Sequence, residues 1–499
     1  MPTAEREPDP PDPTRSGRLL AWLAEGNPLG RRASALARTL HHRAQPTTWA
    51  LLWGTVSAGC FVVLLVTGLL LLPAYDPSGE VVTYAGGYAP LHGLAVSRAF
   101  ASTVHLSLDV PGGLLVRQTH HWAALVLPAS LVLQLTGAFF TGAFRRPRRA
   151  AWVLLVATFV VVLGAGWSGY GLPDDDLSGT GLRIVEGTTL ALPFVGTWLT
   201  FALFGGEYPG RVVEHLYVVH LLAPAALVVL VALRLRLVLR AGPVQLPGAG
   251  RDADRVVGLP AWPQAAARVL GLGFITAGVL TLMGATMTIS PVWRYGPASP
   301  ADAYAGSQPD WYTAFLDGAL RLVPPGWELS VAGRTWTLAV LVPLAAIGTF
   351  FAVLLAWPLL EERLGGDRGE HQVLDRPRDR PARTGVGAAG ATFYGTLWLA
   401  GSADLLATQL HLSFEGVVVA LRVVLLAGPV LAFAVARTAC RTLRAYEEER
   451  ERDGAESGVL EQSPDGGFTE RHVPVPSARA PRTLTAAGPP EPIAAGDGP

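Results

Sequence analysis

The sequence predicts an all-α, polytopic membrane protein with about eight transmembrane helices, and three observations support this fold class. Hydrophobic residues make up 50% of the 499 residues, only 16% are charged, and the mean hydropathy is +0.35. Apolar runs of roughly 20 residues, long enough to cross the hydrocarbon core of a bilayer as a helix, recur along the chain. Arginines gather in alternate connections between these runs. We therefore expect the bilayer to surround most of the chain.

The apolar runs give the order of the expected helices. A polar, proline-rich and arginine-rich segment precedes the first run, and it shows no cleavable signal peptide. The expected spans lie near residues 50–72, 117–143, 150–170, 216–238, 266–289, 336–357, 391–409 and 417–437.

The arginines predict the orientation of these spans. Arginine-rich segments precede the first span, join the second to the third, follow the fourth, separate the sixth from the seventh, and follow the eighth. The other connections carry few arginines. Because loops rich in arginine stay on the cytoplasmic side of a membrane, we expect a multi-pass protein of the plasma membrane with both termini in the cytoplasm.

Composition limits how a cofactor could be attached. Cys60 and Cys440 are isolated in the sequence, so they form neither a disulfide framework nor a CxxCH motif for covalent haem. Other side chains must hold any cofactor. We expect contact with membrane lipid and no nucleic-acid partner.

Three of the eleven histidines, His120, His121 and His220, lie well inside predicted spans. A single histidine in a membrane helix often makes only a hydrogen bond between helices. His120 on the second span and His220 on the fourth are expected at similar depth toward the outer face. Two imidazoles so placed can supply both axial ligands of a haem iron. His121 points about 100° away from His120 on the helix, so we expect a packing or hydrogen-bonding role for it.

Glycines on the neighbouring spans fit the same interpretation. Gly54 and Gly68 on the first span and Gly169 on the third could let a flat macrocycle approach the helix backbones. Glycine is also common in transmembrane helices without any such purpose. The glycines alone therefore leave both interpretations open.

From Trp53 to about Arg444 the chain resembles cytochrome b of the quinol–cytochrome c reductase (bc1) complex, in its actinobacterial form. The resemblance rests on stretches that occur in the order of that family: VRQTHHWAA, FFTGAFRRPRR, GYGLPDDDLSGTGLRI, FVGTWLTFALFGG, HLYVVHLLAP, SQPDWYTAFLDGALRL and LDRPRDRPARTG.

The resemblance implies a haem-binding four-helix bundle in the amino-terminal half. It implies that His120 and His220 bind the iron of an outer haem b, with Arg117 as a partner of a haem propionate. The expected domains are 1–47, a cytoplasmic amphipathic and polar segment; 48–245, the haem-binding bundle; 246–445, a carboxy-terminal cytochrome b domain of four helices; and 446–499, a disordered cytoplasmic tail.

The resemblance also implies a quinol-oxidation site near the outer face. The stretch PDWY, which ends at Tyr312, is similar to the motif that serves this reaction in the family. Asp310 and Tyr312 are the candidates for taking or relaying quinol protons, and Tyr170 is expected to line the same pocket. A carboxylate beside a quinol hydroxyl suits proton transfer. By itself the motif could simply be a helix start with an acidic first turn.

The sequence departs from the family at the second haem. The family holds two haems with histidines fourteen residues apart, because that spacing returns to nearly the same helix face about 21 Å along the axis. Here the corresponding positions are Gln134 and Arg234, and neither side chain is a suitable haem ligand. Leu155 stands where the family has a glycine fourteen residues before Gly169. We therefore expect one haem b, at the outer site, and loss of the inner one.

The implied function is that of the cytochrome b subunit, with quinol or menaquinol as substrate; the sequence leaves the type of quinone open. The implied partners are a Rieske iron–sulfur subunit and a c-type cytochrome in a dimeric complex. Two alternatives follow from the missing ligands: a diverged single-haem subunit, or a non-catalytic subunit with a structural or assembly role. We also expect Arg234 to reach toward lipid headgroups, and the inner connection 358–390 to be solvated surface.

Overall fold

The computed structural model describes residues 28–474, except 42, 47, 207–209, 249, 300 and 302–309, and it is mostly helical. Its helices are α2 (Pro28–His41), α3 (Trp49–Leu71), α4 (Arg98–Leu108), α5 (Gly113–Thr141), α6 (Arg149–Gly171), α7 (Asp176–Leu190), α8 (Gly196–Phe204), α9 (Val212–Ala241), α10 (Ala266–Thr286), α11 (Val292–Tyr295), α12 (Ala314–Leu322), α13 (Leu338–Gly365), α14 (Pro381–Gly401), α15 (Ala403–Leu410) and α16 (Phe414–Asp453).

Short strands form two-stranded antiparallel pairs between or beyond the helices. The pairs are β1 (Ala44–Gln45) with β4 (Leu259–Pro260), β2 (Val81–Thr83) with β3 (Ala95–Ser97), β5 (Glu328–Val331) with β6 (Arg334–Thr337), and β7 (Ala455–Gln462) with β8 (Phe468–Val473). Single turns of other helix types are η1 (Leu72–Ala74), η2 (Ala89–Leu91), η3 (Ala261–Ala265) and η4 (Pro377–Asp379).

Helix caps mark the start of α3 and the end of α5. The Thr48 hydroxyl accepts a hydrogen bond from the amide of Leu51 at the start of α3. Helix α5 ends at Gly142, whose φ of +68° is the left-handed conformation that glycine adopts without steric cost. Prolines inside α5, α9, α13 and α16 are tolerated because neighbouring helices compensate for the lost backbone hydrogen bonds.

Within the described residues, seven helices are long and apolar enough to cross a membrane: α3, α5, α6, α9, α10 with the turn before it, α13 and α16. This confirms the predicted fold class, a polytopic and mostly helical membrane protein. The seventh expected span, 391–409, is wrong in its boundaries. The helix there is α14, which begins at Pro381 and ends at Gly401, and the separate short helix α15 follows it.

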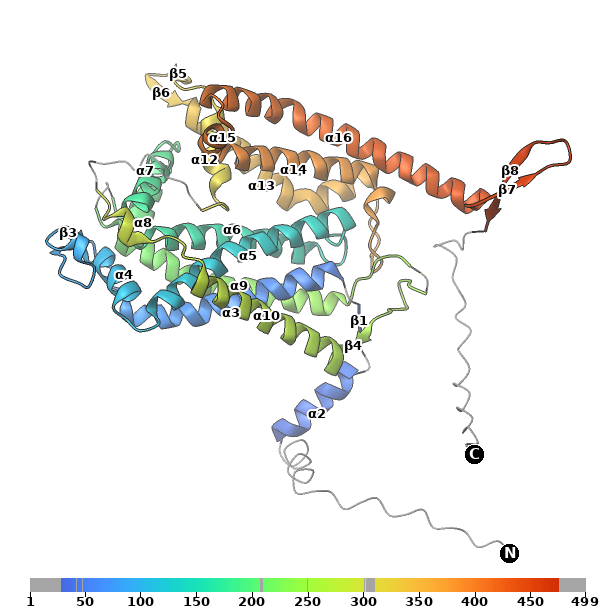
Figure 1. Cartoon of the computed structure of the whole chain (residues 1–499), viewed down its shortest axis with the longest axis horizontal. Helices are drawn as coiled ribbons and strands as arrows, with labels where there is room; N and C mark the ends of the chain where they lie inside the picture. Colours follow the sequence, from blue (N-terminus) through green and yellow to red (C-terminus); the bar gives the residue numbers. More distant parts are fainter. Residues whose placement is uncertain are drawn as a thin grey trace, which may run out of the picture.

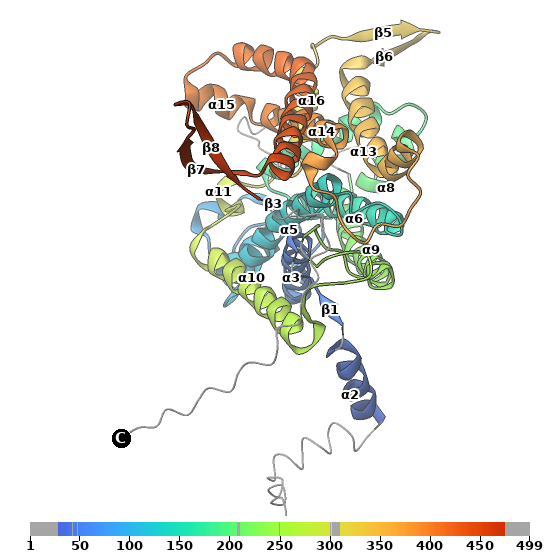
Figure 2. The same ribbon diagram turned by 90° about the vertical axis from the view of Figure 1, so that its right-hand side faces the viewer.

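The long helices run roughly parallel and form two groups (Figure 1). Helix α3 packs on α5 and α10, and α6 packs on α9. In the second group α14 packs on α16 and on the short helix α12. The view along the helices shows the second group stacked on α6 and α5 (Figure 2). The core of the first group is built from Leu127, Leu131, Trp152, Leu155 and Leu227.

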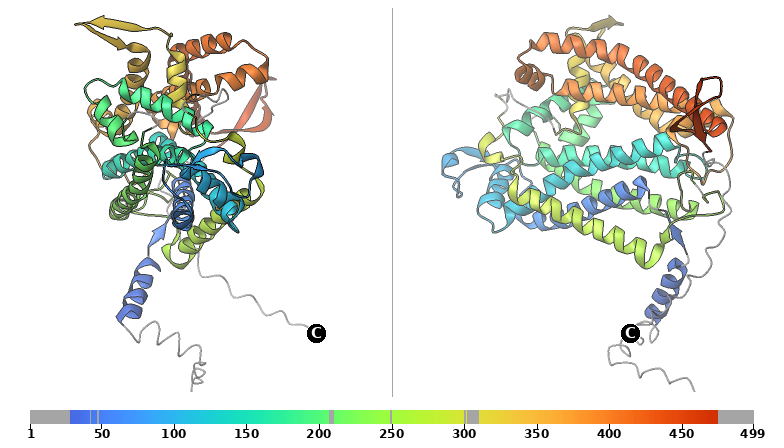
Figure 3. Two further views of the ribbon diagram at one scale, coloured as in Figure 1. Left: turned by 90° about the vertical axis from the view of Figure 1, so that its left-hand side faces the viewer. Right: turned by 45° about the vertical axis from the view of Figure 1, so that its right-hand side comes forward.

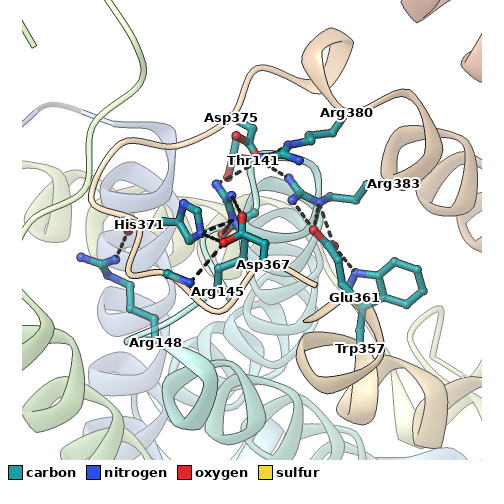
Figure 4. A network of polar contacts seen from close by, with 12 residues as sticks. Thr141, Arg145, Arg148, Trp357, Glu361, Asp367, His371, Asp375, Arg380 and Arg383 are labelled. Atoms are coloured by element: carbon teal, nitrogen blue, oxygen red, sulfur yellow. Dashed lines mark hydrogen bonds and ion pairs between the residues drawn. The ribbon is translucent and has the colours of Figure 1, made fainter. Parts of the chain in front are cut away.

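The connection between α13 and α14 joins the two groups at the predicted inner end, where ion pairs link it to the α5–α6 connection (Figure 4). Arg383 donates to Glu361 over 2.9 Å and to Asp375 over 2.8 Å. Arg145 pairs with the same Asp375 over 2.9 Å. The side chain of Arg383 is only 3% exposed. The expectation that 358–390 is solvated surface holds for residues 363–370, which are exposed, but it is wrong for Arg383 and Asp375, whose charges pair between the helices.

The predicted disordered tail is also partly structured. Helix α16 continues to Asp453, and the β7–β8 hairpin follows it beyond the end of the bundle (Figure 1). The helix is held after residue 446 by Glu447, which accepts from Arg376 over 3.2 Å and from Arg378 over 2.6 Å. Residues 475–499 lie outside the described part of the chain. Near the start of the chain, α2 projects from the bundle (Figure 3).

Candidate functional site

A cavity of about 370 Å³ lies among α3, α5, α6 and α9 at the predicted outer end of the bundle. This volume is in the range of pockets that bind cofactors and small ligands. The predicted residues that line it are His120, His220, Arg117, Gly68, Gly169, Tyr170, Asp310 and Tyr312. Residues from four helices and from the loop before α12 therefore meet in one space.

The two histidines expected to bind iron face each other across this cavity. Their ring centroids are 6.3 Å apart and the ring planes are inclined by 64°. A metal held by two imidazole nitrogens at about 2.0 Å keeps the centroids of opposed rings roughly 6.3 Å apart, since a ring nitrogen lies about 1.15 Å from its centroid. The separation of the His120 and His220 ring centroids therefore matches the one that a metal held between two imidazoles needs.

Hydrogen bonds select the nitrogen that each ring presents to the cavity. Nδ1 of His220 lies 3.0 Å from the carbonyl oxygen of Ala165, which can only accept, so Nδ1 carries the hydrogen. Nδ1 of His120 lies 2.9 Å from Oγ1 of Thr67, which already donates to the Val63 carbonyl over 2.6 Å. Both rings therefore donate through Nδ1 and keep Nε2 as a free lone pair. Metal-binding histidines are commonly oriented in this way.

Two of the predicted glycines make room for these rings. A Cβ on Gly169 would lie 2.6 Å from Cε1 of His220, and one on Gly68 would lie 3.4 Å from Cε1 of His120. The glycines were expected to admit a macrocycle, and in the structure they lie directly against the rings of these two histidines. Gly54 is not part of this cavity, and its nearest side-chain atom is Oε1 of Gln134, 3.7 Å from the position of a Cβ.

Arg117 is the basic side chain that lines the same cavity close to the histidines. It is 9% exposed, and its Nη2 donates to the Ser290 carbonyl over 2.8 Å. The guanidinium lies over the ring of Trp293 at 5.9 Å. Its Nε is buried and has no hydrogen-bond partner among the described residues. A carboxylate in the cavity, such as a haem propionate, would satisfy this donor.

The acidic residue of the PDWY stretch points into the cavity and accepts hydrogen bonds from two directions. The Tyr312 hydroxyl donates to Oδ2 of Asp310 over 2.9 Å, and Nε2 of His121 lies 3.2 Å from both carboxylate oxygens. Burial, followed by the nearby Asp310 carboxylate, raises the pKa of Tyr312 well above its ordinary value. Tyr170 lines the cavity on the same side. The structure thus brings the three predicted catalytic residues to one cavity.

The hydrogen-bonding role expected for His121 is confirmed, but its partner, Asp310, was not predicted. Asp310 lies 189 positions further along the chain, in the loop before α12, and no local pattern shows that this loop returns to α5. The indole of Trp311 fixes that loop by donating to the Leu125 carbonyl over 3.2 Å. Trp398 of α14 donates to the Trp311 carbonyl over 2.9 Å.

At the depth expected for a second haem, hydrogen-bonded polar side chains take the positions of the histidines. Arg234 donates from Nη2 to Oε1 of Gln134 over 3.2 Å, and Gln134 donates to Oγ of Ser57 over 2.6 Å. Ser57 is also hydrogen-bonded to Ser130 at 2.6 Å. Arg234 therefore turns into the bundle, and the expectation that it reaches toward lipid headgroups is wrong. The neutral amide of Gln134 offers it an acceptor at lower cost than an unpaired charge in hydrocarbon.

Leu155 is a further buried side chain at this depth of the bundle. It is 2% exposed and belongs to the same apolar core as Leu131, which is 3% exposed. Leu127 and Leu227 of that core line the outer cavity, so Leu131 and Leu155, with Gln134 and Arg234, are the residues found at the inner depth. The described residues at this depth contain no imidazole pair, so they do not fit a haem.

The sequence is similar to curated proteins over nearly its whole length. A family model described as cytochrome b(N-terminal)/b6/petB matches residues 125–297. The chain is 39% identical over 483 residues to the cytochrome bc1 complex cytochrome b subunit of Streptomyces coelicolor, covering 95% of this chain and 88% of that protein. The same subunit of Mycobacterium leprae is 39% identical over 466 residues, covering 92% and 84%.

The fold is similar to that of a solved chain from a hyperthermophilic respiratory complex III. The TM-score is 0.61, and the match covers 84% of this chain and 98% of the solved one. The sequence identity is 18%, so this likeness supports the arrangement of the helices alone.

Proposed function

The chain belongs to the family of cytochrome b subunits of the bc1 complex, and we propose that it holds a single haem b between His120 and His220. As such it is a subunit of the quinol–cytochrome c reductase of respiratory electron transport. The observation that carries the single-haem proposal is the contrast between the two depths of the bundle. One depth presents two free imidazole nitrogens across a cavity, and the other is closed by Gln134, Arg234 and Leu155.

The outer site has the parts that quinol oxidation needs. A haem bound by the two imidazoles would supply one-electron redox chemistry, and Arg117 would hold a propionate. Asp310 takes the proton of a quinol hydroxyl, because its carboxylate lies in the same cavity and accepts hydrogen bonds there. Tyr312 keeps its hydrogen on its own oxygen, since burial raises its pKa, and it steadies the acceptor. Tyr170 completes the wall of the pocket.

The inner half of the bundle has a different part in this proposal. The second haem of the family would sit about 21 Å from the first, fourteen residues along each helix. Gln134 and Arg234 are hydrogen-bonded to each other at that position. We propose that electrons from quinol leave this chain on the side where they enter and do not cross to the predicted inner face.

Orientation and partners complete the proposal. The arginine-rich end of the bundle faces the cytoplasm, together with both termini, and the His120–His220 end faces outward. A Rieske iron–sulfur subunit and a c-type cytochrome, in a dimeric complex, would accept the electrons at that outer face. A quinol of the menaquinol or ubiquinol kind is the proposed substrate.

The test is haem content and quinol oxidation in the purified complex. His120→Ala and His220→Ala should each remove the haem b absorbance and lower the turnover. His215→Ala is the matched control, because His215 lies on the same helix as His220 but bonds the Ala202 carbonyl at 3.1 Å outside the cavity. Haem retained in both cavity variants would refute the assignment. A wild-type complex without haem would favour the structural or assembly role.

A further inference from the structure

We propose that His121 is a positioning residue for quinol oxidation, which holds the carboxylate of Asp310 in the orientation that receives the quinol hydroxyl. This inference rests on the proposed function of the cavity. It assigns a role to a histidine that neighbours a haem ligand in sequence but faces the opposite side of the cavity.

One ring nitrogen of His121 contacts both carboxylate oxygens of Asp310. Nε2 of His121 lies 3.2 Å from Oδ1 and 3.2 Å from Oδ2 of Asp310. The two side chains are 16% and 14% exposed, so water competes little for the contact. Because Nε2 is equally far from both oxygens, His121 holds the carboxylate group in place as a whole. The bond from Tyr312 to Oδ2 alone then distinguishes the two oxygens and sets the rotation of the group about its last side-chain bond.

The remaining contacts show which acceptor site stays open. The Tyr312 hydroxyl donates to Oδ2 over 2.9 Å, so Oδ2 receives hydrogen bonds from Tyr312 and from His121. Oδ1 receives a hydrogen bond from His121 alone among the described residues. A carboxylate oxygen can accept two hydrogen bonds. The second site on Oδ1 is therefore left for a donor in the cavity, and a quinol hydroxyl is such a donor.

The surrounding backbone would not fix the carboxylate without His121. The indoles of Trp311 and Trp398 tie down the main chain of the loop, and the Thr313 hydroxyl donates to the Asp310 carbonyl over 2.9 Å. None of these bonds reaches the side-chain oxygens. Tyr312 alone binds one oxygen, and a carboxylate held by one bond can move about it. His121 removes this freedom by adding a second contact point, so that the position of the group and its rotation are both held.

The test compares two substitutions of His121 in the purified complex. His121→Leu removes the donor and should lower kcat for quinol oxidation by about 10- to 100-fold, the scale expected when a reacting group is misplaced by about an ångström. His121→Gln keeps an N–H donor on a side chain of similar reach and should recover most of the lost turnover. Haem absorbance should be unchanged in both variants.

The matched control is His105→Leu. His105 forms a similar pair with Asp109, at 3.0 Å, outside the cavity, and this substitution should leave turnover and haem content as in the wild type. Asp310→Asn should lower kcat by itself, and adding His121→Leu to it should cause little further loss, because both changes disable one unit.

Each outcome separates this inference from the proposed function. Unchanged kcat in His121→Leu, or equal loss in the Leu and Gln variants, would overturn the positioning role. Loss of haem in both His121 variants would also overturn it, since the residue would then serve the haem site. Full activity in Asp310→Asn would instead refute the proposed quinol chemistry.

Discussion

The hydrogen bond between Gln134 and Arg234 permits a quantitative test of the closed inner site. Gln134→Leu removes the acceptor of Arg234 and the donor to Ser57, at distances of 3.2 and 2.6 Å. A hydrogen bond to a charged group is worth about 1.5–3 kcal/mol, although coupling between membrane helices averages only about 0.6 kcal/mol. We expect Gln134→Leu to lower the free energy of unfolding by about 2 kcal/mol.

Arg234→Leu should lower the free energy of unfolding by less than Gln134→Leu does, because it removes a charge from hydrocarbon as well as a hydrogen bond. The double variant should lose about 1 kcal/mol less than the two single losses added together, because neither partner is left behind. The assay is unfolding of the purified chain by SDS in mixed micelles, followed by tryptophan fluorescence. Losses that add within about 0.5 kcal/mol would refute the contact. A changed haem spectrum in either variant would contradict the assignment of this pair as a structural one.

Three further predictions concern other parts of the structure. Gly169→Ala should displace the ring of His220 and lower haem occupancy, whereas Gly164→Ala, on the same helix with open space around it, should not; absorbance measures both. Burial raises the pKa of the Asp174 carboxyl group to about 6, so the native state binds a proton there more tightly than the unfolded chain does. The free energy of unfolding should therefore fall as the pH rises from about 4 to about 6, by up to about 3 kcal/mol. Asp174→Asn should remove this pH dependence of unfolding in SDS. Arg148→Ala should cost about 3 kcal/mol in the same assay, because its guanidinium donates to the carbonyls that end α9, and Arg148→Lys should lose part of that amount.

The membrane fold could be predicted from sequence because hydrocarbon imposes a simple length and polarity rule. Six expected spans agree closely with helices of the structure, and the errors fall where that rule is weak. Helix α14 begins at Pro381, ten residues before the expected start, because a helix packed among other helices can carry a buried cation. The buried cation is Arg383, and its pairing with Glu361 and Asp375 neutralises its charge.

The histidine pair could be predicted because its depth follows from position along two spans. The spacing of His120 and His220 needed only helix geometry, and the structure brings their rings to 6.3 Å. The contact of His121 with Asp310 could not be predicted, since it depends on the path of a loop between distant helices. The inward turn of Arg234 was also hidden, because a long side chain near a helix end can reach either headgroups or a polar neighbour.

The most direct measurement for the whole account is the number of haem b groups per chain in the purified complex, with a redox titration of their absorbance. One haem per chain and a single one-electron transition are expected, since one depth of the bundle offers two imidazoles and the other offers Gln134 and Arg234. Two haems per chain with two separate transitions would contradict the account.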